Sequence, residues 1–151
     1  MWSKGYWNLK VGGWVIAVHG WEQGQRDLRI MEEKITLVLG ASPKADRFSN
    51  KAVRKLMAAR HPVIAVGRRA DVIGNEPIRT EIPEGARVHT VTLYLNPHNQ
   101  EVWVERILAL KPQRIIFNPG TENDAFEKSA TALGIEVVEG CTLVMLASGQ
   151  Y

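Results

Sequence analysis

The sequence predicts an α/β fold of the Rossmann-like, doubly wound type, with about five mainly parallel strands and helices on both faces of the sheet. Short runs of β-branched and apolar residues alternate along the chain with segments of helical period, and Gly or Pro punctuates them. Such alternation favours right-handed crossovers and a mainly parallel sheet. A length of 151 residues suffices for one core and excludes a second full domain.

The expected strands are mostly short and rich in β-branched and apolar residues. In chain order they cover residues 35–39, 63–66, 87–95, 114–117 and 136–139. The segment between the second and third strands contains Gly74, Pro77, Pro83 and Gly85 together with many charges. We expect a loop there.

Four helices are expected between and after these strands. Ser49 is a candidate cap for the first, which Pro62 ends. Residues 100–110 have apolar side chains at helical spacing. Thr121, followed three residues later by Asp124, resembles a capping box, and residues 142–147 predict a closing helix.

The first thirty residues differ from the rest in composition. A short strand is expected there at residues 14–18, and four of the five tryptophans lie in this segment: Trp2, Trp7, Trp14 and Trp21. We expect residues 1–30 to be an extension, with Met31 as the functional start of a domain covering 31–151. The alternative is a genuine N-terminal strand or arm that docks its tryptophans on a partner.

Charge and composition exclude several classes of protein. The net charge is +3, and because the first thirty residues carry four bases and two acids, only +1 is left for the remainder, which argues against nucleic acid as a partner. Cys141 is the single cysteine and the four histidines are scattered, so neither a disulfide nor a metal site is expected. No apolar run is long enough to span a membrane, and we expect a reduced, cytoplasmic setting.

In sheets of this type, ligands bind outside the carboxyl ends of the strands, where the strand order reverses. If the order is 3-2-1-4-5, the loop that starts at Gly40 lies beside the loop Asn118–Thr121. Both loops lead into helix N-termini, where backbone N–H groups and the helix dipole favour phosphate.

The first of these loops differs from the dinucleotide fingerprint, because Ser42 and Ala45 stand where its second and third glycines would be. Ser42 can nevertheless donate a hydrogen bond to phosphate, and Lys44 and Arg47 can neutralise it. The alternative is that this loop is a turn with a solvated, charged surface.

Two cations, Arg68 and Arg69, follow the second strand. An NAD site usually has a carboxylate at this place to bind the ribose hydroxyls. The arginines therefore favour a ligand with an extra phosphate on its adenosine ribose, either NADP or coenzyme A. The alternative is that they are exposed loop charges.

Four short motifs in this order resemble those of the small stand-alone CoA-binding proteins. They are Gly40-Ala41-Ser42-Pro43 with Arg47, Ser49 and Asn50; Val66-Gly67 at the end of a strand; Asn118-Pro119-Gly120-Thr121-Glu122-Asn123; and Glu139-Gly140-Cys141-Thr142-Leu143-Val144-Met145-Leu146. These proteins have a Rossmann-like fold similar to the CoA-binding domain of the succinyl-CoA ligase alpha chain. The resemblance extends from Lys34 to Tyr151.

The resemblance implies an adenine-nucleotide end held near the first loop, with Val66, Gly67 and Arg68 flanking the adenosine. Many relatives have Asn-Pro after the second strand where this chain has Gly67-Arg68, and the phosphorylated histidine of the larger ligase has no counterpart here. Together, the resemblance and the loop chemistry predict these ligand-binding residues: Gly40, Ala41, Ser42, Lys44, Arg47, Ser49, Val66, Gly67, Arg68, Asn118, Pro119 and Gly120.

The sequence therefore predicts a protein that binds coenzyme A or an acyl-CoA, with no identified catalytic residue and no metal. An NADP-dependent oxidoreductase is one alternative, although the chain has no Tyr-x-x-x-Lys pair to supply a proton. A nucleotide-regulated protein-interaction module is the other, because fold alone does not determine function. Whether the protein forms a homo-oligomer stays open.

Overall fold

The computed structural model describes residues 8–11, 14–17 and 34–151. The chain divides into two compact units, Met1–Glu32 and Glu33–Tyr151. In the first unit, β1 (Asn8–Val11) and β2 (Trp14–Ala17) pair antiparallel, and β2 corresponds to the short strand expected at residues 14–18.

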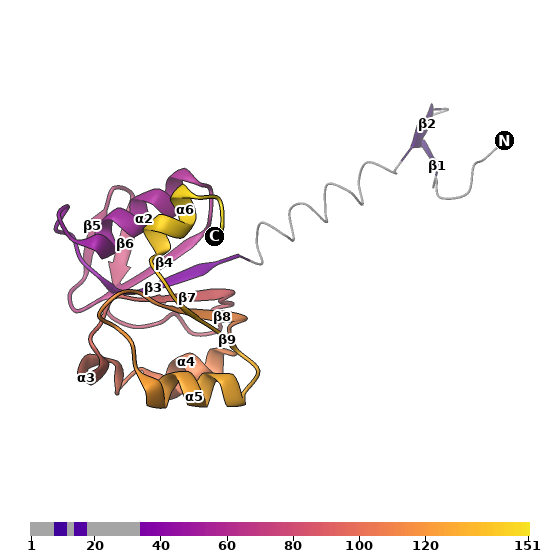
Figure 1. Cartoon of the computed structure of the whole chain (residues 1–151). Helices are drawn as coiled ribbons and strands as arrows, with labels where there is room; N and C mark the ends of the chain where they lie inside the picture. Colours follow the sequence, from indigo (N-terminus) through magenta and orange to yellow (C-terminus); the bar gives the residue numbers. More distant parts are fainter. Residues whose placement is uncertain (1–7, 12–13, 18–33) are drawn as a thin grey trace. The chain divides into compact units, whose positions relative to one another are not determined.

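The second unit is built on a seven-stranded sheet with the order β5-β6-β4-β3-β7-β8-β9 (Figure 1). Its strands are β3 (Thr36–Ala41), β4 (Val63–Gly67), β5 (Asp71–Ile73), β6 (Glu76–Arg79), β7 (Thr90–Leu93), β8 (Arg114–Phe117) and β9 (Glu136–Glu139). All neighbours are parallel except β5 and β6. The predicted α/β, Rossmann-like class is confirmed.

The predicted strand order is wrong in one respect. The five expected strands occur in the order 2-1-3-4-5, because β7 pairs with β3 rather than lying beyond β4. Thr36 pairs with Thr90 and Leu39 with Leu93. The strand order therefore reverses between β3 and β7, next to the site that the sequence predicted.

The segment predicted as a loop between β4 and β7 contains two strands. β5 and β6 form an antiparallel hairpin, and β6 extends the sheet beside β4. Gly74 begins the tight turn with φ +63°, and Ile73 and Ile78 are buried. The hairpin thus accounts for the two strands beyond the expected five.

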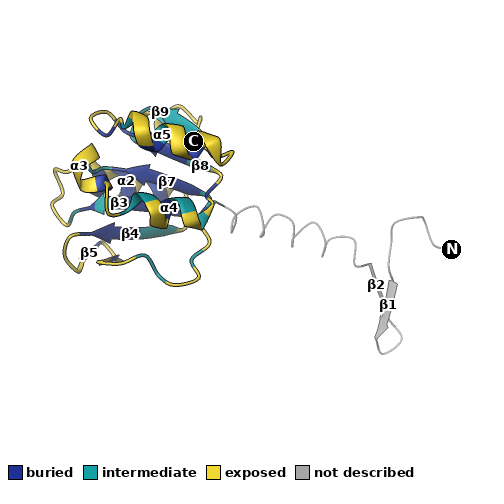
Figure 2. Cartoon of the chain, turned by 90° about the horizontal axis from the view of Figure 1, so that it is seen from below, coloured by how far each residue is buried: buried dark blue, intermediate teal, exposed yellow. Residues whose placement is uncertain are grey.

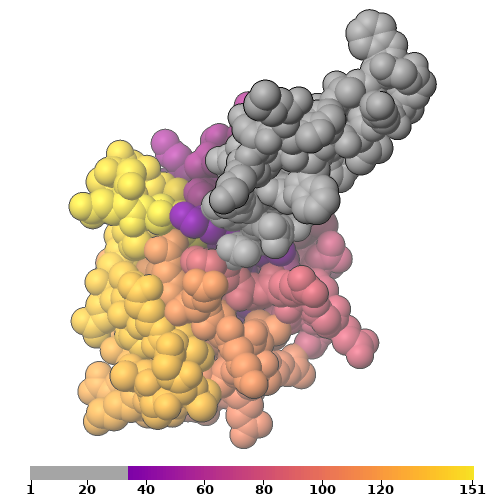
Figure 3. Space-filling model, turned by 90° about the vertical axis from the view of Figure 1, so that its right-hand side faces the viewer, coloured from indigo at the N-terminus to yellow at the C-terminus, as the bar shows by residue number. Residues whose placement is uncertain are grey.

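Two layers of helices cover the sheet (Figure 1). The helices are α2 (Phe48–Ala58), α3 (Pro97–Gln100), α4 (Val104–Leu110), α5 (Asp124–Ala132) and α6 (Thr142–Ala147). α2 and α6 lie on one face, and α4 and α5 on the other. In the space-filling view of Figure 3, the yellow C-terminal segment and the orange segment of α5 accordingly occupy separate parts of the surface. Among the described residues, none of the helices has the length and apolar character needed to cross a bilayer.

The core follows the alternation of side chains along the central strand. Leu37 and Leu39 belong to an apolar cluster with Ile107 of α4 and Phe126 of α5, whereas Val38 belongs to a second cluster under α2. Successive side chains of a strand point to opposite faces of the sheet, so β3 contributes to both cores. Figure 2 shows the result, with mainly dark blue strands and yellow outer surfaces on the helices.

Three expectations about helix ends are corrected. Arg47, not Ser49, precedes α2, and Ser49 is buried within the first turn. Asn123 caps α5 by accepting from Phe126 N at 3.2 Å, whereas the hydroxyl of Thr121 donates to the Asn118 carbonyl at 2.7 Å. The helix expected at residues 100–110 begins only at Val104 as α4, because α3 ends at Gln100 and a turn follows it.

The last residue, Tyr151, packs at the amino ends of the strands. Its hydroxyl shares a 2.5 Å hydrogen bond with the hydroxyl of Thr36, the first residue of β3. The Arg114 guanidinium lies 4.5 Å from the centroid of the Tyr151 ring, and the His61 ring is 4.9 Å away. The C-terminus is therefore fixed at the amino ends of the central strands, whereas the predicted site lies at their carboxyl ends.

Candidate functional site

Two adjoining cavities lie at the carboxyl ends of the central strands. The first, of about 630 Å³, is lined mainly by the loop after β3, the start of α2 and the residues after β4, and we call it the cationic cavity. The second, of about 480 Å³, is bordered by Trp103, and we call it the tryptophan cavity. Gly40 and Arg68 line both, so the two cavities lie side by side at these residues.

Four exposed cations line the cationic cavity: Lys44, Arg47, Arg68 and Arg69. None of them forms an ion pair with another residue in the described part of the chain. Asp71 also lines this cavity and is the one carboxylate among its lining residues. The arrangement leaves several positive charges available to an anionic ligand.

The N-terminus of α2 faces the same cavity, which Phe48 and Ser49 line. The first turn of α2 contains no acidic residue, and no side chain caps it. The first N–H groups of a helix have no partner within the helix, and together with the helix dipole they favour an anion. The cations and the helix end therefore act on the same space.

Asn50 fixes the loop that leads into α2. Its buried side chain donates through Nδ2 to the Ser42 carbonyl at 2.9 Å, and its Oδ1 accepts from Arg54 Nε at 2.9 Å. The hydroxyl oxygen of Ser42 accepts from the Lys44 amide at 3.3 Å. The loop conformation is thus held by the helix that follows it.

Two glycines allow the strand ends to approach each other. Gly40 has φ +94°, and a Cβ there would lie 3.0 Å from the carbonyl carbon of Tyr94. A Cβ on Gly67 would lie 2.3 Å from the Ala41 carbonyl oxygen. No larger residue fits at either position without moving backbone, and this close packing forms the floor of the site.

Asn118 is a structural residue between β8 and α6. It is buried, and its Nδ2 donates to Thr92 Oγ1 at 2.7 Å and to the Leu93 carbonyl at 2.9 Å. Its Oδ1 accepts from the Thr142 amide at 2.9 Å. Asn118 lines neither cavity, whereas its neighbours Pro119 and Gly120 line the cationic cavity.

The surroundings of Gly120 are acidic. The Gly120 amide donates to Glu122 Oε2 at 2.8 Å, so this N–H already has a carboxylate partner. Asp124 and Glu127 occupy the first turn of α5, and the nearby carboxylate of Glu127 raises the pKa of Glu139. Of the two helix N-termini expected to attract phosphate, α2 has the electrostatics for it and α5 does not.

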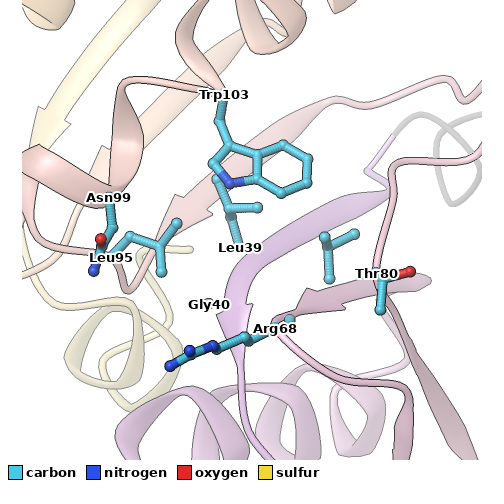
Figure 4. A pocket seen from close by; sticks show the side chains of 9 residues that line it. Leu39, Gly40, Arg68, Thr80, Leu95, Asn99 and Trp103 are labelled. Carbon is cyan, nitrogen blue, oxygen red and sulfur yellow. The ribbon is translucent and has the colours of Figure 1, made fainter.

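The sequence predicted the tryptophan cavity only in part, because four of its lining residues were among the expected ligand-binding residues: Gly40, Val66, Gly67 and Arg68. Its lining includes Leu39, Val66, Leu95, Asn99, Thr80 and Trp103. Figure 4 shows the indole of Trp103 over the end of Leu39, with Leu95 and Asn99 to one side, Thr80 to the other, and Arg68 opposite. Trp103 is the one tryptophan outside the first 21 residues, which is the sequence feature that could have pointed to it.

Tyr94 lines the cationic cavity, but its hydroxyl is buried without a hydrogen-bond partner. Burial raises the pKa of Tyr94 to about 12, and the nearby hydroxyls of Thr142 and Thr92 offset this only in part. The phenol is therefore neutral at physiological pH and is no ready proton acceptor.

The predicted ligand-binding residues are brought together. All of them line one or both cavities except Asn118: these are Gly40, Ala41, Ser42, Lys44, Arg47, Ser49, Val66, Gly67, Arg68, Pro119 and Gly120. The lining residues outside this prediction include Asp71 of the hairpin, Thr80 directly after it, and three residues of the α3–α4 region: Asn96, Asn99 and Trp103.

Comparisons with known proteins agree with this architecture. A crystal structure described as that of an uncharacterized protein is 47% identical, covers 78% of this chain and 98% of its own, and superimposes with a TM-score of 0.75. A structure from Thermus thermophilus (22% identity, 83% of this chain and 98% of its own, TM-score 0.70) shares the fold. A hypothetical protein from Pyrococcus horikoshii OT3 (23% identity, 82% and 89%, TM-score 0.69) shares it too.

Among curated proteins, none is similar enough to this chain to count as a match. The family model described as "CoA binding domain", however, matches residues 34–147, which include both cavities and every residue predicted to bind the ligand. The chain belongs to the CoA-binding domain family.

Proposed function

We propose that this protein binds coenzyme A, or an acyl-CoA, through its phosphates and its adenosine at the carboxyl ends of the parallel strands, without identified catalysis. The observation that carries the proposal is the cationic cavity at the N-terminus of α2, with four cations free of ion pairs in the described part of the chain. Coenzyme A carries a pyrophosphate and a ribose phosphate, so its charge complements this cavity.

The residues proposed to contact the ligand are those that line the two cavities. Ser42, Lys44 and Arg47 extend from the loop before α2, and Arg68 stands where the two cavities meet. Arg68 is therefore the residue best placed to contact the ligand between its base and its phosphates. We assign Asn118 a positioning role, because its side-chain amide already forms hydrogen bonds with Thr92, Leu93 and Thr142.

NADP is the second candidate ligand, since Arg68 and Arg69 suit a ribose phosphate equally well. An oxidoreductase also needs a proton donor beside the nicotinamide. Tyr94, the one tyrosine that lines either cavity, has its hydroxyl buried away from the open space. This favours coenzyme A binding over NADP-dependent chemistry.

Calorimetric titration with coenzyme A, acetyl-CoA, NADP and NAD tests the proposal. We expect saturable binding of coenzyme A with one site per chain, weaker binding of NADP and none of NAD. No heat of binding with coenzyme A at millimolar concentration would contradict the proposal. Native mass spectrometry of freshly purified protein would also reveal a co-purifying ligand and the number of subunits.

We also propose a reducing, cytoplasmic setting. Cys141, the only cysteine, is a half-buried free thiol at the start of α6 and has no second cysteine with which to pair. Fractionation of cells that produce the protein, with its thiol trapped by alkylation, tests this placement.

A further inference from the structure

An ion pair joins the two walls of the tryptophan cavity from outside. Arg106 of α4 pairs through its guanidinium with the carboxylate of Glu81, and both side chains are more than half exposed. Glu81 directly follows Thr80, which forms one wall of the cavity, and Arg106 lies one helical turn beyond Trp103, which forms the other. The pair therefore links the segment after β6 to α4.

Arg106 also contacts the indole itself. Its guanidinium carbon lies 5.3 Å from the centroid of the Trp103 ring, within the range of a cation–π contact. Neither Arg106 nor Glu81 lines the cavity. Trp103 itself does line the cavity, so the indole is in contact both with the guanidinium and with the open space.

The remaining walls suit a flat ring with polar edges. Leu39, Val66 and Leu95 are apolar, while Thr80 and Asn99 place polar groups at the sides of the cavity (Figure 4). Purine bases have apolar faces and hydrogen-bonding edges, and they stack on aromatic side chains without strict geometric requirements.

The family resemblance already implies that Val66, Gly67 and Arg68 flank the adenosine, and these residues line the tryptophan cavity. From the contacts of Trp103 we propose that the purine base stacks on its indole, and that Arg106 and Glu81 are positioning residues that hold the indole and set the width of the cavity. The proposal rests on the proposed binding of coenzyme A. Arg68 lines both cavities, so a base in this cavity has its phosphates directed into the cationic one.

Substitution of Trp103 should weaken coenzyme A binding more than substitution of Arg106 or Glu81. Loss of stacking on one aromatic residue weakens binding about 5- to 150-fold, so Trp103→Ala should weaken coenzyme A binding in this range. Exposed ion pairs contribute little, and Arg106→Gln or Glu81→Gln should each weaken binding about 2- to 5-fold. Because the two side chains act as one pair, the double variant should lose little more than either single variant.

The experiment titrates the full-length protein with coenzyme A and with adenosine 3′,5′-bisphosphate, which contains the base and two phosphates but no pantetheine. Trp103→Ala should weaken both ligands by the same factor, and Trp103→Phe should restore most of the affinity. Glu84→Gln is the matched control for Glu81→Gln, because Glu84 is an exposed carboxylate three residues further along that lines neither cavity. Unfolding curves identify any variant that does not fold. If Trp103→Ala does not fold, the affinities of Trp103→Phe, Arg106→Gln and Glu81→Gln test the proposal.

Fluorescence gives a readout that a purely structural role would not change. Coenzyme A should quench tryptophan emission of the native protein, and this quenching should disappear in Trp103→Phe although the ligand still binds. If coenzyme A binds the native protein but its affinity is unchanged in Trp103→Ala and no quenching depends on Trp103, the base lies elsewhere and this proposal is wrong. If coenzyme A does not bind the native protein at all, the proposed function fails first.

Discussion

The backbone at Gly67 approaches that at Ala41 so closely that a Cβ on Gly67 would lie 2.3 Å from the Ala41 carbonyl oxygen. Gly67→Ala must therefore push the end of β4 away from the loop after β3. We expect a loss of about 1–3 kcal/mol in the free energy of unfolding, together with weaker coenzyme A binding. Gly140→Ala is the control, since a Cβ there meets its nearest atom at 3.6 Å. Urea unfolding of both variants measures the difference, and equal stability would contradict the predicted clash.

Reversal of charge at Arg47 or Arg68 should weaken coenzyme A binding by about 1–3 kcal/mol, through loss of a charge-assisted hydrogen bond and added repulsion. Arg87→Glu changes the net charge equally, but Arg87 is exposed and lines neither cavity. Titrations at two salt concentrations separate a local contact from a general field effect. If Arg47→Glu, Arg68→Glu and Arg87→Glu bind alike, the two arginines are solvated surface charges.

Asn118→Ala should destabilise the fold more than it weakens binding. The substitution removes three hydrogen bonds and leaves the Thr142 amide without its acceptor, at a cost of about 2–4 kcal/mol in unfolding free energy. Its coenzyme A affinity, measured well below the unfolding transition, should change less than that of Arg47→Glu. A loss of affinity with full stability would show instead that Asn118 contacts the ligand.

Stability should fall as the pH falls through the range in which histidine protonates. Burial lowers the pKa of His61 below its ordinary value near 6.5, and the positive charges of Lys34, Arg114 and His89 lower it further. The unfolded chain therefore takes up a proton at a higher pH than the folded one. Folding stability is lost from about pH 6.5 downward until the folded state also protonates.

The test compares urea unfolding of the native protein and of His61→Gln between pH 8 and pH 5. The variant should lose less stability on acidification than the native protein. His98→Gln, at an exposed position in α3, should follow the native protein. Parallel pH profiles for the native protein and His61→Gln would contradict the prediction.

A chain that begins at Met31 should fold with the same unfolding free energy and the same coenzyme A affinity as the full chain. All residues that line the two cavities lie between Leu39 and Thr121, within the second compact unit. Circular dichroism and titration of the shortened protein check this. Failure to fold would mean that the segment before Met31 has a structural role.

The fold class was predictable from the sequence because it depends on local patterns. Runs such as residues 63–66 are apolar and short, and Gly or Pro follows or precedes most of them. The hairpin of β5 and β6 could not be predicted from the sequence. Its strands contain Pro77 and several charges and adjoin Gly74, and they bury little more than Ile73 and Ile78. Their pairing depends on the edge that β4 offers, which no local pattern describes.

The strand order could not be predicted from the sequence either, because it also depends on contacts between distant segments. Whether β7 pairs with β3 or lies beyond β4 is decided by contacts between segments about fifty residues apart. The loop with Ser42, Lys44 and Arg47 was nevertheless predicted as part of the site, since it follows β3 in either strand order. Trp103 and Thr80 were missed because their meeting requires the corrected order and the hairpin together.

The contact between Tyr151 and Thr36 brings the two ends of the folded domain together on the side away from the cavities. A domain whose ends meet can be inserted into a loop of a host protein, because the host chain enters and leaves at neighbouring points. It can also be circularly permuted, with a short linker joining the old ends and new ends opened at an exposed turn such as that of Gly85. Either rearrangement leaves the order and pairing of the strands around the ligand site intact.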